Sequence, residues 1–127
     1  MLTQTSQPLT GYRFLIAEDE ILQAQRVGDM VADMGGTVAK IVYSFEQARA
    51  AISDTAFDCA ILDINLSGTL SFRLAESLKR QRIPFIFCTA YAEAADVYPD
   101  APATPRVDKP VRPTDLRDAL LTVLLAR

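Results

Sequence analysis

Short apolar runs alternate with amphipathic segments along this chain, and the alternation predicts the order of its elements. Four segments have the length and the apolar, branched or aromatic content of strands: 12–17, 37–43, 57–62 and 84–88. Residues 106–109 predict a short fifth strand. After the first strand, apolar residues recur with a helical period: Ile21, Ala24, Val27, Val31 and Met34. Strands that alternate with helices predict an α/β domain with a parallel sheet and right-handed crossovers.

Local signals predict where several of these elements begin and end. Gly35 follows the first helical stripe, and Ser44 with Gln47 has the spacing of a capping box at the start of a second helix ending near residue 54. Residues 63–68 are expected to form a loop, and Pro113 suits the first turn of the last helix. A third helix is predicted by a leucine stripe: Leu70, Leu74 and Leu78.

Two segments carry weaker signals. Residues 92–97 could form about two helical turns, whereas the three prolines of YPDAPATP predict irregular structure up to residue 105. Residues 1–11 are polar and predict a flexible N-terminal tail. We therefore expect one domain over residues 12–127, with no room for an output domain.

Composition limits the classes of function. Half of the 127 residues are hydrophobic and the formal net charge is −3, which argues for a globular protein and against nucleic-acid binding. The N-terminus lacks the basic start and apolar core of a signal peptide, and no apolar run approaches the roughly 18 residues of a membrane span. We therefore expect a cytoplasmic protein that does not contact membranes.

Reactive polar residues stand where four of the predicted strands end. Glu18 and Asp19 follow the first strand, Asp63 the third, Thr89 the fourth, and Lys109 the fifth. In a parallel sheet of strand order 2-1-3-4-5, these carboxyl ends lie at one edge, where such sheets bind ligands. We therefore expect the three acids, the hydroxyl and the amine to share a crevice.

This set of groups favours phosphoryl chemistry at a metal. Clustered carboxylates repel one another unless a cation joins them, and a site of oxygen ligands favours Mg²⁺. Asp63 could then act as a nucleophile that accepts a phosphoryl group, with Lys109 as counter-charge and Thr89 as a hydrogen-bond donor. The chain has no histidine, so a histidine donor must come from a partner. Taken singly, each residue has an ordinary structural explanation: the acids as helix or turn residues, the lysine as a solvated charge.

Four stretches, FLIAEDE, AILDINLSG, FIFCTAY and VDKP, occur in this order. With them, the chain from residue 12 to the last helix resembles the receiver domain of two-component response regulators. The resemblance implies a flavodoxin-like (βα)5 fold with helices on both faces of the sheet. It also implies that Asp63 is the phosphoacceptor and that Mg²⁺ is bound by Glu18, Asp19, Asp63 and the backbone carbonyl of Asn65. Thr89 and Lys109 would contact the phosphoryl group, and the bond before Pro110 is commonly cis in this family.

The chain departs from the usual receiver pattern at two positions. Arg106 stands where receivers usually carry an aromatic switch, which makes signalling by that ring doubtful, and Tyr91 becomes the candidate switch aromatic. PFIFCTAY partly matches the FATGUY-type motif of a subset that responds to HWE or related kinases, although Ala90 replaces the usual glycine. Ser67 stands where many receivers have proline, and is expected only to loosen the loop, without touching the chemistry.

We expect a stand-alone receiver, a signalling protein rather than an enzyme. It would take a phosphoryl group from a sensor histidine kinase or a phosphotransfer protein, lose it slowly, and act through an unknown downstream protein or as a phosphate sink. One alternative is a phosphorylation-independent interaction module, since Leu121 and Leu125 extend the apolar surface of the last helix and could support a dimer. A remote alternative is a haloacid-dehalogenase-like phosphatase, which Asn65 disfavours because an amide cannot serve as the general acid.

Overall fold

A computed structural model describes residues 7–90 and 105–126 of the chain. All neighbouring strands of its main sheet pair in parallel, in the order β2-β1-β3-β6-β7. These strands are β1 (Arg13–Ala17), β2 (Thr37–Val42), β3 (Cys59–Asp63), β6 (Phe85–Thr89) and β7 (Arg106–Asp108). The order is the predicted 2-1-3-4-5 arrangement, so the predicted fold class is confirmed.

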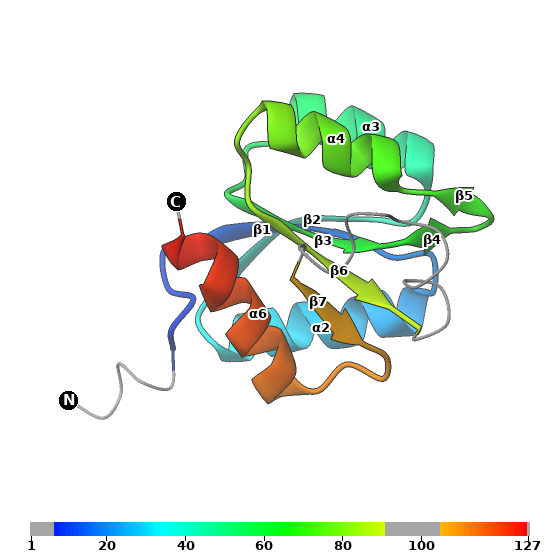
Figure 1. Cartoon of the computed structure of the whole chain (residues 1–127). Helices are drawn as coiled ribbons and strands as arrows, with labels where there is room; N and C mark the ends of the chain where they lie inside the picture. Colours follow the sequence, from blue (N-terminus) through cyan, green and yellow to red (C-terminus); the bar gives the residue numbers. More distant parts are fainter. Residues whose placement is uncertain (1–6, 91–104, 127) are drawn as a thin grey trace.

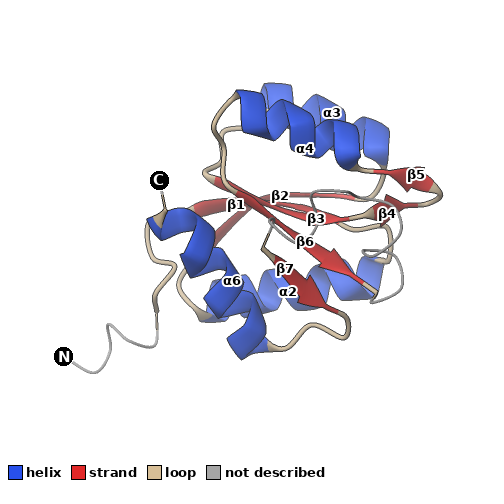
Figure 2. Cartoon of the chain, in the orientation of Figure 1, coloured by secondary structure: helices blue, strands red, loops and turns tan. Residues whose placement is uncertain are grey.

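Helices cover both faces of the sheet (Figures 1 and 2). One face carries α2 (Ile21–Asp33) and α6 (Pro113–Leu125), and the other carries α3 (Phe45–Asp54) and α4 (Phe72–Arg80). Successive residues of a strand point to opposite faces, so Phe14 joins the core on the α2 side and Leu15 the core on the α3 side. Because both faces are covered, β3 and β6 are buried along their whole length, which explains why their sequences are almost continuously apolar.

The predicted helix ends are largely as observed. The Ser44 hydroxyl accepts a hydrogen bond from the N–H of Gln47 at 3.1 Å and caps α3. The Gln47 side chain accepts the N–H of Tyr43 at 2.8 Å, one residue earlier than in a standard capping box. Gly35 follows α2 with φ of +89°, a conformation that suits glycine at this position.

The expected loop over residues 63–68 is instead partly a hairpin. Residues Asn65–Leu66 form β4 and residues Thr69–Leu70 form β5, and the two pair in antiparallel fashion. The turn between them has positive φ at both Ser67 (52°) and Gly68 (90°), the combination that closes a two-residue hairpin. Leu70 therefore lies in the hairpin, 39% exposed, rather than on the stripe of α4.

Contacts with the core begin closer to the N-terminus than the sequence predicted. Leu9 is fully buried in the core beside α2, and its N–H donates to the Met34 carbonyl at 3.0 Å. Leu9 therefore packs with the domain, whereas Gln7, Thr10 and Gly11 are exposed. The predicted helical turns over 92–97 and the candidate switch Tyr91 lie outside the described residues.

No helix in the described part of the chain is long and apolar enough to cross a membrane.

Candidate functional site

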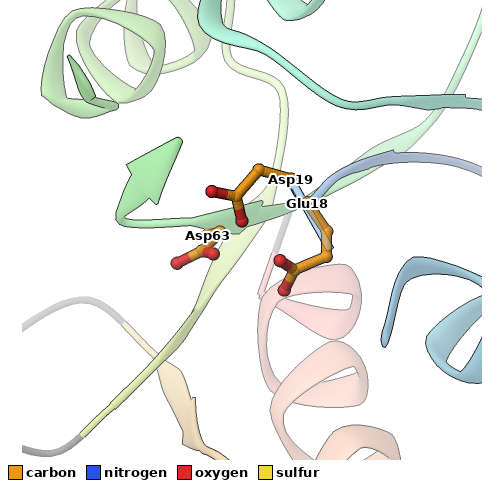
Figure 3. A group of neighbouring side chains, drawn as sticks. All are labelled: Glu18, Asp19 and Asp63. Atoms are coloured by element: carbon orange, nitrogen blue, oxygen red, sulfur yellow. The ribbon is translucent and has the colours of Figure 1, made fainter. Parts of the chain in front are cut away.

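Three carboxylates meet where β1 and β3 end. The two strands are direct neighbours, so Glu18 and Asp19 after β1 come close to Asp63 at the end of β3. Figure 3 shows the three side chains gathered around one point, and one oxygen from each lies within 4.8 Å of the others. Glu18 and Asp63 are each only 5% exposed. The structure thus brings together the acids that the strand ends predicted.

Lys109 joins this cluster from the segment after β7. Its Nζ lies 2.9 Å from Oε1 of Glu18 and 2.9 Å from Oδ2 of Asp63. The backbone places it there, because the Lys109 N–H donates to the carbonyl of Thr89 at 2.9 Å. The bond that follows, to Pro110, is cis. One ammonium group therefore bridges carboxylates from two strands.

Burial and charge shift the pKa values of these groups. Burial raises the pKa of Glu18 to about 7, although its hydrogen bond to Lys109 acts in the opposite direction. Burial likewise raises the pKa of Asp63, again opposed by Lys109. For Lys109, burial alone would lower the pKa, but the hydrogen bonds and charges of the two acids outweigh it and raise the pKa. Lys109 therefore remains charged near neutral pH, whereas Glu18 is partly protonated there.

Ser67 contacts the remaining acid, which the sequence did not predict. Its N–H and its hydroxyl approach the same oxygen, Oδ2 of Asp19, at 2.8 and 3.2 Å. Burial would raise the pKa of Asp19, but hydrogen bonds from Glu18 and from Ser67 hold it below its usual value. Ser67 therefore contacts an acid of the site, and the expectation that it leaves the chemistry untouched stays a prediction. The available signal was the absence of proline, because only a residue with an N–H can donate here.

The hairpin after Asp63 also holds that residue in place. The Asn65 N–H donates to Oδ1 of Asp63 at 3.2 Å, and the buried Ser71 hydroxyl donates to the Asp63 carbonyl at 2.7 Å. The Asn65 side chain accepts the N–H of Gly68 at 2.7 Å, so its amide serves the turn. Asn65 thus has a structural role in the turn, in addition to lacking the acidic proton that a haloacid-dehalogenase-like phosphatase requires at this position. Ser71 was not predicted, because a serine before a helix indicates an N-cap, whereas this hydroxyl bonds to the carbonyl of Asp63 instead.

A solvent-open crevice of about 520 Å³ leads to the acids. Its lining includes Asp19, Glu20, Gln23, Asp63, Asn65, Gly68, Ala90 and Lys109. Thr89 lies at the end of β6, fully buried, and its hydroxyl donates to the Ala90 carbonyl at 3.0 Å. Its contact with a phosphoryl group therefore stays a prediction. Arg106 is exposed on the edge strand β7.

The residues present fit a divalent cation. Glu18, Asp19 and Asp63 offer only carboxylate oxygens, which are the ligands that Mg²⁺ prefers. Three carboxylates less the one ammonium of Lys109 leave a formal charge of −2, which such a cation would neutralise.

Comparison with known proteins places this geometry in a family. The model of the response regulator receiver domain matches residues 14–121. The positive alginate biosynthesis regulatory protein of Pseudomonas aeruginosa is 32% identical over 110 residues, which cover 84% of this chain and 44% of that protein. The chain thus spans less than half the length of this relative.

Solved structures agree with this assignment. The receiver domain of Erythrobacter litoralis PhyR superposes with a TM-score of 0.80 at 26% identity, covering 93% of both chains. The solution structure of SdrG from Sphingomonas melonis Fr1 superposes with a TM-score of 0.77 at 32% identity, covering 89% of this chain and 96% of that one. Together with the match over residues 14–121, these similarities show that the chain belongs to the response regulator receiver domain family.

Proposed function

We propose that the chain is the phosphoacceptor of a two-component pathway and that Asp63 receives the phosphoryl group. The observation that carries this proposal is the placement of Asp63 within 4.8 Å of two further acids and 2.9 Å from Lys109. An aspartate that only forms a turn does not need a buried ammonium group beside it. A nucleophile that accepts a phosphoryl group does, because the ammonium group stabilises the negative charge of the phosphoryl oxygens. The donor is the histidine of a sensor kinase, of the HWE type or a related one, or of a phosphotransfer protein.

In this reaction one Asp63 oxygen bonds to phosphorus as the bond from phosphorus to the donor's ring nitrogen breaks. The electron pair of that bond stays with the imidazole ring. Negative charge then lies on the phosphoryl oxygens, and Lys109 can turn to one of them from its place 2.9 Å from Asp63. The Asn65 N–H holds the other Asp63 oxygen, so the carboxylate is fixed before the donor arrives.

Glu18, Asp19, Asp63 and the backbone carbonyl of Asn65 would hold Mg²⁺, which neutralises phosphoryl charge when bound. Thr89 would hydrogen-bond the attached group, and slow hydrolysis would end the signal. The phosphorylated chain then acts through contact with a downstream protein or serves as a phosphate sink. We propose Tyr91 as the switch aromatic, since Arg106 occupies the usual position.

An interaction module that ignores phosphorylation is less well supported. Leu125 is 73% exposed, and Leu121 is partly buried against the core, so α6 offers limited apolar surface to a partner or a second copy. Such a module has no use for Glu18 and Asp63 buried together, an arrangement that raises the pKa of both. The acid cluster therefore favours the phosphoacceptor.

The test is phosphorylation by acetyl phosphate with Mg²⁺, followed by intact-mass spectrometry. The wild-type chain should gain one phosphoryl group, and addition of a chelator should prevent it. Asp63→Ala should gain none, while Asp33→Ala, at the exposed end of α2, should behave as wild type. Full labelling of Asp63→Ala would refute the assignment.

A further inference from the structure

A groove runs between α3 and α4 on the face of the sheet opposite α2 and α6. Two adjoining pockets form it, of about 350 and 490 Å³, and they share Phe45, Glu46 and Arg73. The first also includes Arg49, Ile52, Ser53, Leu74, Ser77 and Arg80, and the second Thr69, Leu70 and Phe72. None of these residues lines the crevice at Asp63, so this α3–α4 groove is a separate surface.

The charged residues of the α3–α4 groove are mostly basic. Arg49 pairs with Glu46 at 2.6 Å, and both side chains are exposed. Arg73 and Arg80 are exposed and form no salt bridge among the residues that the structure describes. Two unpaired positive charges thus face solvent here, although the chain as a whole carries −3. Such a patch attracts carboxylates over the distance of a Debye length, about 8 Å at physiological salt.

The floor of the groove is apolar. Ile52 and Leu74 are buried beneath it, Phe45 and Phe72 are partly buried, and Leu70 is 39% exposed. Figure 1 shows the β4–β5 hairpin, which carries Leu70, next to the start of α4. A phosphate or a nucleic-acid backbone would leave this apolar surface uncovered, whereas an amphipathic peptide would cover it.

The spacing of Arg73 and Arg80 along α4 matches the repeat of a second helix. Arg73 and Arg80 are seven residues apart on α4, which corresponds to two turns and a rise of about 10.5 Å. A second helix lying along α4 repeats at the same rise, so acidic residues seven positions apart on it would meet both guanidinium groups. Apolar residues of the same helix, three or four positions along, would then face the floor.

We propose that the α3–α4 groove binds an acidic amphipathic helix of a partner protein, through Arg73 and Arg80 and the apolar surface at Leu70. This contact is independent of phosphoryl transfer at Asp63. It gives the domain a second point of attachment, on the face away from α6.

Binding can be tested by heteronuclear NMR with designed peptides of roughly 18 residues, long enough to be helical. One peptide carries glutamates seven positions apart beside a leucine stripe, and its matched partner carries lysines at the same positions. The acidic peptide should shift amides of α3, β5 and α4, and should bind roughly tenfold more weakly to Arg73→Glu/Arg80→Glu. Arg73→Gln/Arg80→Gln should give a smaller loss.

The control variant is Arg26→Glu/Lys40→Glu, which makes the same charge change at exposed positions of α2 and β2. It should bind the acidic peptide as the wild type does. The proposal is overturned if the lysine peptide binds equally well, if shifts centre on α2 or α6, or if millimolar acidic peptide causes none. Binding of anionic vesicles that depends on Arg73 and Arg80, without binding of the peptide, would equally overturn it in favour of a membrane contact.

Discussion

The N–H and the hydroxyl of Ser67 both approach one carboxylate oxygen of Asp19, at 2.8 and 3.2 Å. Ser67 holds this position with φ of 52°, a conformation unusual for a residue with a side chain. The hairpin after the proposed phosphoacceptor is thereby tied to an acid that follows a different strand.

Replacing Ser67 should shift the titration of Asp19. Ser67→Gly keeps the N–H and suits the positive φ but removes the hydroxyl, so the pKa of Asp19 should rise slightly. Ser67→Pro removes both donors and cannot adopt φ of 52°, so the pKa should rise further. NMR titration of the Asp19 carboxyl carbon without metal measures both. If the titration is the same in wild type and Ser67→Pro, the hydrogen bonds do not act on Asp19.

The pKa of Glu18 predicts how pH affects the domain. It rises from 4.5 to about 7 on folding, so between these values the folded state binds a proton that the unfolded state lacks. In the absence of metal, the contribution of Glu18 to the free energy of unfolding is therefore greatest below about pH 4.5 and is lost as the pH rises through about 7. Mg²⁺ must displace the same proton, so its affinity should increase up to about pH 7 and then level off.

Calorimetric titration with Mg²⁺ on both sides of pH 7 tests this prediction. Glu18→Gln carries no titrating group at this position, so its weaker Mg²⁺ binding should depend much less on pH over this range. A wild-type affinity that does not change between about pH 6 and pH 8 would mean that Glu18 is already ionised.

Loss of the Lys109 charge should destabilise the domain most where the acids are ionised. Lys109 is 19% exposed and bridges Glu18 and Asp63, so Lys109→Met leaves two buried carboxylates without their counter-charge. We expect a loss of about 3 kcal/mol in the free energy of unfolding near pH 8, and less near pH 5, where Glu18 is protonated. Urea denaturation at the two pH values measures the difference.

The control for this experiment is Lys40→Met on the exposed side of β2, which should change stability by less than about 0.5 kcal/mol. An equal loss for Lys109→Met at both pH values would point to lost packing of the lysine stem rather than lost charge.

The sequence predicted the parts of the site that follow from sheet topology. Parallel strands bring their carboxyl ends together, so Asp63, the acids after β1 and Lys109 could be placed in one crevice without knowledge of any contact. The same reasoning placed Thr89 at a strand end but could not give the direction of its hydroxyl, which bonds to the Ala90 carbonyl.

Features that depend on a single backbone conformation or a distant contact were missed. The hairpin requires positive φ at Ser67, which residue preference disfavours, and Ser67 meets Asp19 across 48 positions of sequence. The polar neighbours of Leu9 predict a tail, and only the packed core beside α2 explains its burial. Local patterns do not carry such information, because it arises when separate elements pack.

The bridge from Lys109 to Glu18 makes the charge balance of the acid cluster depend on synthesis of the chain as far as residue 109. These residues are 91 positions apart (109 − 18), and Lys109 directly follows β7. A nascent chain that ends before β7 holds its three acids without their counter-charge. Under the proposed function, such a chain would be a poor phosphoryl acceptor.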